Sequence, residues 1–449
     1  MNFSDLNQTR IALYLSCLIV PLLVTGPFLP DFLLSSLSIW FIYYTLKNKV
    51  FYVFKNNFFY LFIAFCLVCI FSSIRSENML FSFESSLFYF RIGVFALLIS
   101  FLIEHDRNTL RYFYYTLIIT FSFLIFYAIV EYIFHLNKHP SRISSFFGDE
   151  LILGSYLSRL LPLITALFFI KPNKTNLEKY LFLIFFSLTF FSIFLSGERA
   201  ALFYVILFSI IVLFFVRLNL KFYIATIATF IILLFIFISA SNTTSKNLIN
   251  RYKITTIFNL MNVEVQFSES YKITFRAKDD KNFRAKDDKN FRAKDDKKQS
   301  ESKNKKFIFF TLGHDTLYKT AFNMFIDKPF LGHGPKLFRV KCSEPKYAAG
   351  NNSCMTHPHN FYFQLLAETG VVGFSFILLL FIYVMYLFLK FAYYLYFKKQ
   401  KIYSNYQICI LACLFITIWP IIPNGNFFNN YLMIIYSLPL GFFKNKIKF

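Results

Sequence analysis

The chain has 449 residues and a formal net charge of +23 at pH 7, yet only 16% of its residues are charged. Hydrophobic residues make up 57% of the chain and aromatic residues 22%, whereas glycine and proline contribute only 13 residues each. A soluble domain cannot hide so much apolar surface, and a disordered chain does not carry it. The composition therefore predicts a polytopic integral membrane protein.

Apolar segments long enough to cross a hydrocarbon core of about 30 Å recur from one end of the chain to the other. They predict an all-α fold with about twelve transmembrane helices, at residues 10–26, 28–46, 57–74, 86–103, 112–134, 151–170, 180–196, 199–216, 222–240, 370–396, 403–421 and 427–443. The first apolar run leads straight into further spans without a small-residue cleavage site, so we expect no removable signal peptide.

The distribution of Lys and Arg in the short loops predicts the orientation of the chain. Of the 24 basic residues outside the segment 241–360, 18 fall on one side of the predicted spans. That side is assigned to the cytoplasm, and both termini lie there. The prediction divides the chain into a membrane bundle of about nine helices (1–240), a large outer loop (241–369) and a second bundle of three helices (370–449).

The outer loop contains a tandem octapeptide, Arg-Ala-Lys-Asp-Asp-Lys-Asn-Phe, over residues 276–298. A tether for acidic glycans or lipid headgroups is one interpretation of this repeat, and we favour a solvated low-complexity insertion. Residues 241–360 carry a charge of 23 − 12 = +11, and the rest of the chain carries 24 − 12 = +12, mostly as topology signals. The basicity thus predicts no nucleic-acid partner. Farther along the loop, the pattern of 312–326 predicts a helix that ends before Pro329.

Three arginines are predicted at the outer ends of spans. Arg199 lies between two apolar runs, in Ser-Gly-Glu-Arg-Ala, and Arg91 and Arg159 lie near the ends of their own spans. A guanidinium at membrane depth costs roughly 3 kcal/mol or more unless it faces a polar cavity or a partner. Each arginine alone fits a side chain that snorkels to the headgroups. Together they indicate an anion held below the outer surface, because the planar fork of Arg suits phosphate.

A histidine-rich motif, Thr-His-Pro-His-Asn, precedes the tenth predicted span. Pro358 keeps His357 out of helical geometry, so a helix can begin only near His359. A neutral imidazole at that position can accept a proton from a hydroxyl group, and its ordinary pKa of about 6.5 suits a general base. A capping or surface role for His359 is the alternative interpretation.

The run from His359-Asn360 over nine residues to Gly370 resembles the signature of bacterial O-antigen ligases and the related O-antigen polymerases. Residues 196–200 (Ser-Gly-Glu-Arg-Ala) resemble the Ser-Gly-x-Arg element of that family, and residues 329–335 resemble its Pro-x-x-Gly-x-Gly turn, which contains Gly332 and Gly334. The order of these elements, and one large outer loop before the last three spans, also match the family.

This resemblance implies a glycosyltransferase of the bacterial inner membrane, with catalytic helices at 312–369 on the periplasmic side. It implies transfer of a glycan from undecaprenyl diphosphate to a hydroxyl of a lipid A core sugar or another lipid-linked acceptor, without metal or cofactor. His359 is then the catalytic base, supported by Asn360, and Arg199 binds the diphosphate. Arg251 resembles a second arginine of the family's loop, and Arg91 and Arg159 join the predicted diphosphate site.

The chain departs from the family pattern before the Pro-x-x-Gly-x-Gly turn. Relatives commonly have Gly-Arg and Trp-Arg there, whereas this chain has His314 and Lys319 at those places. Arg339 and Lys336, just after the turn, are candidates to supply the missing positive charge.

Two cysteines, Cys342 and Cys354, lie in the outer loop, and the residues between them favour a turn. In an oxidising periplasm they are expected to form a disulfide next to His359. The other cysteines lie in apolar runs, and Cys66-x-x-Cys69 has no second ligand pair at metal spacing, so no metal site is expected.

Two alternative functions remain open from the sequence. An O-antigen polymerase would use a second carrier-linked glycan as acceptor. A transporter or flippase for lipid-linked glycan would use the arginines as an anion path, although the chain shows no repeated half with matching broken spans.

Overall fold

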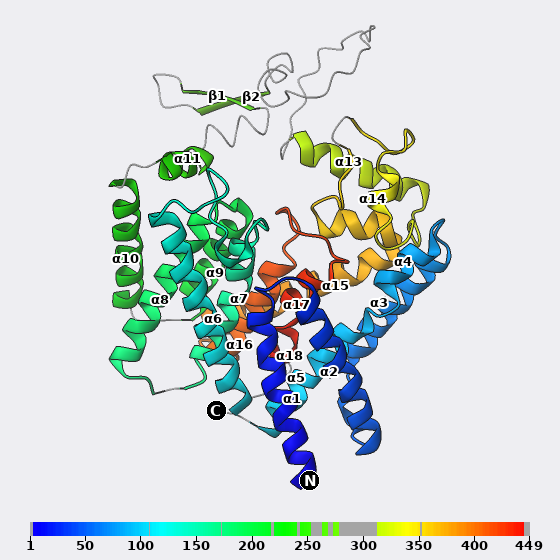
Figure 1. Cartoon of the computed structure of the whole chain (residues 1–449), viewed down its shortest axis with the longest axis horizontal. Coiled ribbons are helices and arrows are strands. Elements are labelled where there is room, and N and C mark those ends of the chain that lie inside the picture. Colours follow the sequence, from blue (N-terminus) through cyan, green and yellow to red (C-terminus); the bar gives the residue numbers. More distant parts are fainter. Residues whose placement is uncertain are drawn as a thin grey trace.

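The computed structural model describes residues 3–106, 108–171, 173–216, 220–239, 243–252, 263–267, 273–277, 312–350 and 353–443. Helices dominate these residues (Figure 1). The first half contains α1 (Phe3–Leu22), α2 (Phe28–Lys47), α3 (Asn57–Ile74), α4 (Met79–Ser86), α5 (Phe90–His105), α6 (Asn108–Ile133), α7 (Leu153–Phe168), α8 (Asn176–Leu195), α9 (Arg199–Phe215) and α10 (Leu220–Ser239). The second half contains α11 (Thr243–Tyr252), α13 (Leu312–Asp327), α14 (Phe338–Lys341), α15 (Phe361–Tyr396), α16 (Asn405–Thr417), α17 (Asn430–Ser437) and α18 (Leu440–Phe443).

Many of these helices have the length and composition of membrane spans. Among the described residues, seven segments are long and apolar enough to cross a membrane: Phe28–Lys47, Asn57–Ile74, Met79–His105, Asn108–Ile133, Asn176–Leu195, Lys221–Ser239 and Phe361–Tyr396. Four shorter apolar segments accompany them: Leu153–Phe168, Arg199–Phe215, Asn405–Thr417 and Asn430–Phe443. The chain is thus a multi-pass membrane protein. All twelve predicted segments overlap helices, while the number of spans and the orientation stay predictions.

One part of the outer loop departs from the all-α prediction. Strands β1 (Val263–Phe267) and β2 (Ile273–Ala277) pair antiparallel, with Val263 opposite Ala277. The sequence Val-Glu-Val-Gln-Phe alternates apolar and polar residues, a two-residue period that favours a strand over a helix. Except for Arg276 and Ala277 in β2, the octapeptide insertion at 276–298 lies outside the described residues.

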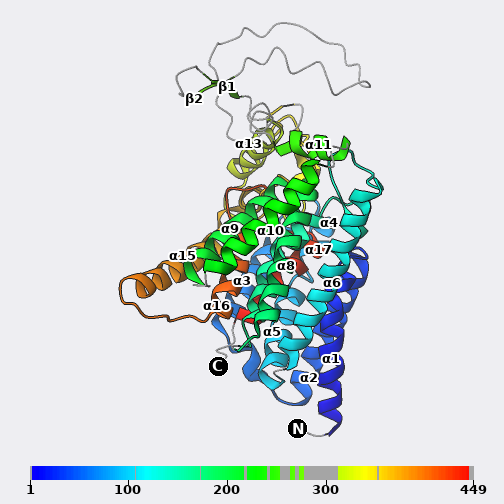
Figure 2. The ribbon, with the colours of Figure 1, turned by 90° about the vertical axis from the view of Figure 1, so that its left-hand side faces the viewer.

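Helix α7 forms the centre of the bundle. It is buried on all sides and packs mainly against α16 and α9. Its polar side chains, Ser158, Arg159 and Thr165, are buried together with its apolar ones. Figure 2 shows the distal part of α15 projecting from the side of the bundle, together with its connection to α16. Two of the predicted site residues, Arg199 at the start of α9 and Arg159 within α7, therefore lie at this packed core.

The Pro-x-x-Gly-x-Gly turn docks against a kink in α15. Gly370 lies at that kink with φ 64°, a conformation that favours glycine. A Cβ on Gly370 would lie 2.2 Å from the carbonyl oxygen of Phe330, and one on Gly332 would lie 2.4 Å from the backbone of Glu368. The glycines therefore let two backbones touch, and the amide of Val371 donates to the carbonyl of Pro329 at 2.8 Å.

Candidate active site

The connection between α8 and α9 brings three arginines together around Gly197. This glycine has φ 68°, and a Cβ there would lie 2.9 Å from Cγ of Arg142 and 3.3 Å from Cδ of Arg251. Only glycine leaves room for both side chains in this turn. Arg199 follows at the start of α9. We call Arg142, Arg199 and Arg251 the arginine cluster.

Backbone carbonyl groups hold the arginine cluster in place. Nε and Nη2 of Arg199 donate to the carbonyl oxygen of Arg251 at 3.2 and 2.7 Å. Nε of Arg251 donates to the carbonyl of Gly197 at 2.6 Å, and Arg142 donates to the carbonyls of Ser196 and Leu151. These acceptors carry no formal charge, so they orient the guanidinium groups without neutralising them.

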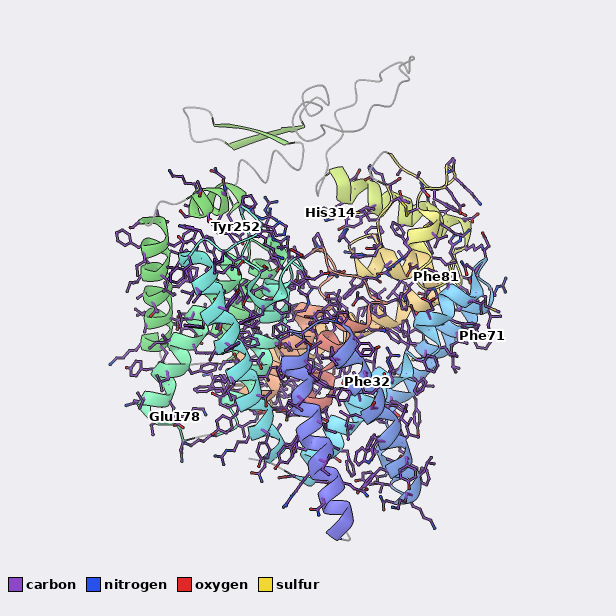
Figure 3. The ribbon with its side chains drawn as sticks, viewed as in Figure 1. Phe32, Phe71, Phe81, Glu178, Tyr252 and His314 are labelled. Atoms are coloured by element: carbon purple, nitrogen blue, oxygen red, sulfur yellow. A yellow bond between two sulfur atoms is a disulfide. The ribbon has the colours of Figure 1, made fainter. Side chains whose placement is uncertain are left out.

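Helix α11 brings Arg251 to this position. Its residue Tyr252 stacks on Phe194 with ring centroids 4.9 Å apart and donates from its hydroxyl to the carbonyl of Phe194 at 3.0 Å. Leu248 is buried on the same helix. The short helix is therefore anchored over the end of α8, where Figure 3 labels Tyr252.

Glu198 is the carboxylate nearest the arginine cluster. Its oxygens accept from the amide of Gly154 at 2.8 Å and from the hydroxyl of Ser155 at 2.6 Å, and its Oε1 lies 3.7 Å from Nη2 of Arg142. It thus occupies the N-terminus of α7, where a helix dipole favours a negative charge. Burial raises the pKa of Glu198, against the hydrogen bond from Ser155 and the charge of Arg142. Three guanidinium groups beside one such carboxyl leave an excess of positive charge, which suits an anion.

The other two predicted arginines lie apart from this cluster. Arg91 forms an ion pair with Asp31 of α2 at 2.6 Å, and Asp31 also accepts from Asn430 of α17. The contacts of Arg91 therefore tie α5 to its neighbours. Arg159 is 3% exposed and lies between the rings of Tyr204 and Tyr436, 4.6 and 4.8 Å from their centroids.

The buried guanidinium of Arg159 is only partly satisfied. Its Nε and Nη1 have no hydrogen-bond partner among the described residues, although cation–π contacts on two aromatic rings stabilise the charge. An ionisable side chain at membrane depth with open donors is by default a candidate functional residue.

His359 is held in a fixed, uncommon conformation immediately before α15. Its φ is 57°, a left-handed value that is unusual for a residue other than glycine. Its carbonyl accepts the amide of Asn424 at 2.8 Å, and the side chain of Asn424 accepts the amide of Phe361 at 2.9 Å. Asn360 caps α15 by accepting the amide of Tyr362 at 2.9 Å. Hydrogen bonds at its own carbonyl and at the two residues that follow it thus fix the backbone geometry of His359.

Three imidazoles meet at this position, and we call them the histidine cluster: His314, His357 and His359. The ring of His359 lies 4.2 Å from that of His357 and 5.6 Å from that of His314, measured between centroids. Burial lowers the pKa of His359. Burial, and then the neighbouring His359, lower the pKa of His314 to about 4 and that of His357 to about 3. All three imidazoles are therefore neutral near pH 7 and able to accept a proton.

The basic residues near the turn have different partners. Lys319 pairs with Asp315 one helical turn earlier, and Lys336 lies 3.7 Å from Glu84. Arg339 is exposed on α14, and its charge contributes to the lowered pKa of His357. Of the residues considered for the missing positive charge, Arg339 is the one placed beside the histidine cluster.

The structure joins Cys342 and Cys354 in a disulfide, with their Cα atoms 4.8 Å apart. Cys342 also packs in a small apolar core with Leu317, Ala321 and Met324 of α13. The bridge therefore links the core under α13 to the segment that leads into His357 and His359.

The site has two halves, one at the arginine cluster and one at the histidine cluster, and Tyr204 of α9 lies between them. On one side its ring contacts the guanidinium of Arg159. On the other side it contributes to the raised pKa of Tyr318, although burial of Tyr318 is the larger cause. Tyr318 in turn stacks on Phe363 of α15, with centroids 4.7 Å apart. Within the described ranges, no hydrogen bond or ion pair joins the arginine cluster to the histidine cluster. Figure 3 labels Tyr252 and His314, one on each half, at the same end of the molecule.

The sequence predicts site roles for His359, Asn360, Arg199 and Arg251 but indicates none for several of their neighbours. Arg142 is an isolated loop arginine that belongs to no motif, so the sequence gives no signal for its place in the cluster. Asn424 comes from the connection between α16 and α17, 64 residues after Asn360, and nothing local indicates its role. Across the described segments, no group of three or more His, Cys, Asp or Glu side chains is arranged to hold a metal ion.

Comparison with known proteins gives one family. A family model described as O-antigen ligase matches residues 184–378, a range that begins within α8, includes α9 and the outer loop, and ends within α15. No curated protein matches the chain.

Proposed function

The chain belongs to the O-antigen ligase family through residues 184–378, and we propose that it transfers a glycan from undecaprenyl diphosphate to a hydroxyl of a lipid A core sugar. Transfer takes place on the periplasmic face of a bacterial inner membrane. The observation that carries this proposal is the histidine cluster, in which His359 has a fixed backbone and a lowered pKa. Such a neutral imidazole is suited to take a proton during group transfer.

In the proposed reaction His359 acts as the general base. Its imidazole takes the proton of the acceptor hydroxyl while the acceptor oxygen attacks the anomeric carbon of the donor sugar. The bond between that carbon and the phosphate oxygen breaks, and undecaprenyl diphosphate leaves with the electron pair. The proton ends on His359, so charge and atoms balance without another reactant.

The arginine cluster binds the diphosphate and stabilises the charge that it gains as it leaves. Nη1 of Arg199 and both Nη atoms of Arg251 have no hydrogen-bond partner among the described residues, so they are open to phosphate oxygens. Preorganised donors of this kind stabilise a developing charge without reorganising during the reaction. Arg159 supports the lipid-side phosphate from below, whereas Arg91 is already paired with Asp31.

The acceptor separates this proposal from its nearest alternative. Lipopolysaccharide from a strain that lacks the gene is compared with that of the strain complemented by the wild type and by His359→Ala. We expect unattached carrier-linked polymer in the deletion strain, restoration by the wild type and no restoration by His359→Ala.

Two other outcomes would change the assignment. A core carrying a single repeat unit in the deletion strain would indicate an O-antigen polymerase. Restoration by His359→Ala, with normal amounts of the variant in the membrane, would remove His359 as the base and leave the family assignment intact.

A further inference from the structure

A large cavity lies at the end of the bundle away from the histidine cluster. Its volume is about 1310 Å³, and its walls come from α7, α8, α9, α10 and the start of α16. Small-molecule pockets usually measure roughly 300–1,000 Å³. Several apolar residues that line it, including Ile206, Ile210, Leu213 and Ile227, are exposed, so the cavity opens toward the surrounding lipid.

Five lysines surround one end of this cavity: Lys171, Lys174, Lys179, Lys221 and Lys401. Lys171 and Lys174 precede α8, and Lys401 precedes α16, whereas Lys179 and Lys221 lie in the first turns of α8 and α10. Residues far apart in the sequence therefore converge on one rim. No acidic residue lines the cavity in the described ranges, and the nearby Glu178 pairs with Lys171 at 2.8 Å. Figure 3 labels Glu178 at this end of the molecule, opposite to Tyr252 and His314.

The lining changes in character along the cavity. Tyr180, Tyr223 and Tyr403 line the same end as the lysines, whereas Phe186, Phe190 and Phe230 line the deeper part. Tyrosines and lysines together mark the interface between a membrane and water, and phenylalanines mark the hydrocarbon region. The cavity thus offers cations at headgroup level and an apolar groove below them.

We propose that this cavity binds an anionic diacyl phospholipid from the leaflet opposite the histidine cluster. The phosphate lies among Lys174, Lys179 and Lys221, and one acyl chain lies in the phenylalanine groove between α8, α9 and α10. Charge complementarity selects an anionic headgroup, and the open apolar wall admits a chain directly from the bilayer. The site is separate from the arginine cluster and is independent of the proposed transfer reaction.

The test uses the full chain, purified in neutral detergent, and native mass spectrometry with added dioleoyl phosphatidylglycerol or dioleoyl phosphatidylcholine. The wild type should bind phosphatidylglycerol more tightly. The triple variant Lys174→Gln/Lys179→Gln/Lys221→Gln should lose affinity by on the order of 100-fold, at about fivefold per lysine. The matched control Lys390→Gln/Lys398→Gln/Lys399→Gln removes the same charge from exposed lysines outside the cavity and should keep wild-type affinity.

A second variant tests the groove without changing the charge. Ile210→Trp places a bulky ring in the apolar groove. Affinity should fall roughly tenfold, which corresponds to the loss of about two buried methylene groups of the acyl chain. Thermal stability in neutral detergent shows whether each variant is folded. Equal affinity for the two lipids, or an equal loss in the matched lysine control, would overturn the proposal. Displacement of the lipid by millimolar glycerol 3-phosphate would also overturn it, because the acyl chain would then contribute nothing.

Discussion

The arginine cluster carries three positive charges beside one carboxyl group, whereas the histidine cluster contains three imidazoles that burial keeps neutral. Backbone carbonyls orient the arginines and leave some of their nitrogens open. Amide side chains and backbone hydrogen bonds fix the backbone conformation of His359. They do not determine the charge of its imidazole. The first arrangement suits binding of an anion, and the second suits movement of a proton. In the proposed reaction, binding and proton transfer are therefore performed by separate parts of the molecule.

Replacing the base should produce the largest effect. For His359→Gln we expect kcat to fall by roughly 10²–10⁴-fold, because general-base catalysis contributes about that much. Donor affinity should stay the same, because the proposed diphosphate site is the arginine cluster. Both quantities are measured on purified protein with a fluorescent lipid-linked donor.

The control for this change is His135→Gln, which alters an exposed histidine outside both clusters. It should leave kcat unchanged. A parallel loss of donor affinity in His359→Gln would contradict the division between the two clusters.

Removing the disulfide should have the next largest effect, and only on the histidine half. For Cys342→Ala/Cys354→Ala we expect the segment from α13 to His359 to lose about 3 kcal/mol of stability, from the chain-entropy cost of a loop of this length. Limited proteolysis should cut this segment faster, and reduction of the wild type should have the same effect. Equal cleavage rates in oxidised wild type and variant would show that the bridge adds no stability.

Arg251→Gln should weaken donor binding by about 10- to 100-fold, because a hydrogen bond to a charged group contributes about 1.5–3 kcal/mol. The acid limb of the pH–rate profile should not move, because His359 is unchanged. Titration of the protein with labelled donor measures the affinity.

Arg91→Gln is the comparison, since it removes a guanidinium that is already paired with Asp31. It should lower thermal stability while donor affinity stays within about twofold. A shift of the pH–rate profile in Arg251→Gln would show that the two clusters are coupled. It would contradict their division into a part that binds the anion and a part that transfers the proton.

The smallest effect concerns pH. The pKa of His359 lies below its ordinary value of about 6.5, so the rate should be constant above pH 6.5 and fall at lower pH as the base becomes protonated. Stability should change in the same direction. In the unfolded chain His314 binds a proton below its ordinary pKa of about 6.5. In the folded protein it binds one only near pH 4.

Unfolding then takes up protons, and stability falls by up to about 1.4 kcal/mol per pH unit for each such group. Thermal unfolding between pH 7 and pH 5 measures this slope, and His314→Gln should reduce it. An unchanged slope in that variant would exclude His314 as a source.

The sequence predicted the helices and the start of α15 but not the partners of the charged residues. Apolar length is a local property, so all twelve predicted segments overlap helices, and 312–326 is confirmed as α13. Pro358 and Asn360 are likewise local signals for the start of α15. The pairing of Arg91 with Asp31 and the meeting of Arg142 with Arg251 depend on tertiary structure, which no local pattern contains. Helix α15 also begins before Gly370, because a glycine kink lets the cap at Asn360 and the span form one element.

The docking of the Pro-x-x-Gly-x-Gly turn on the α15 kink has a mechanical consequence. The amides of His333 and Gly334 donate to the carbonyls of Ala367 and Glu368, and Ser72 of α3 donates to the carbonyls of both Leu331 and Glu368. Together with the disulfide, these bonds make α13, the turn and the start of α15 a single stiff arm that carries all three histidines. The arm is itself bonded to α3 through Ser72 and to the connection between α16 and α17 through Asn424. We therefore expect it to stay in place when a lipid-borne donor binds, so that the spacing of the imidazoles is preserved.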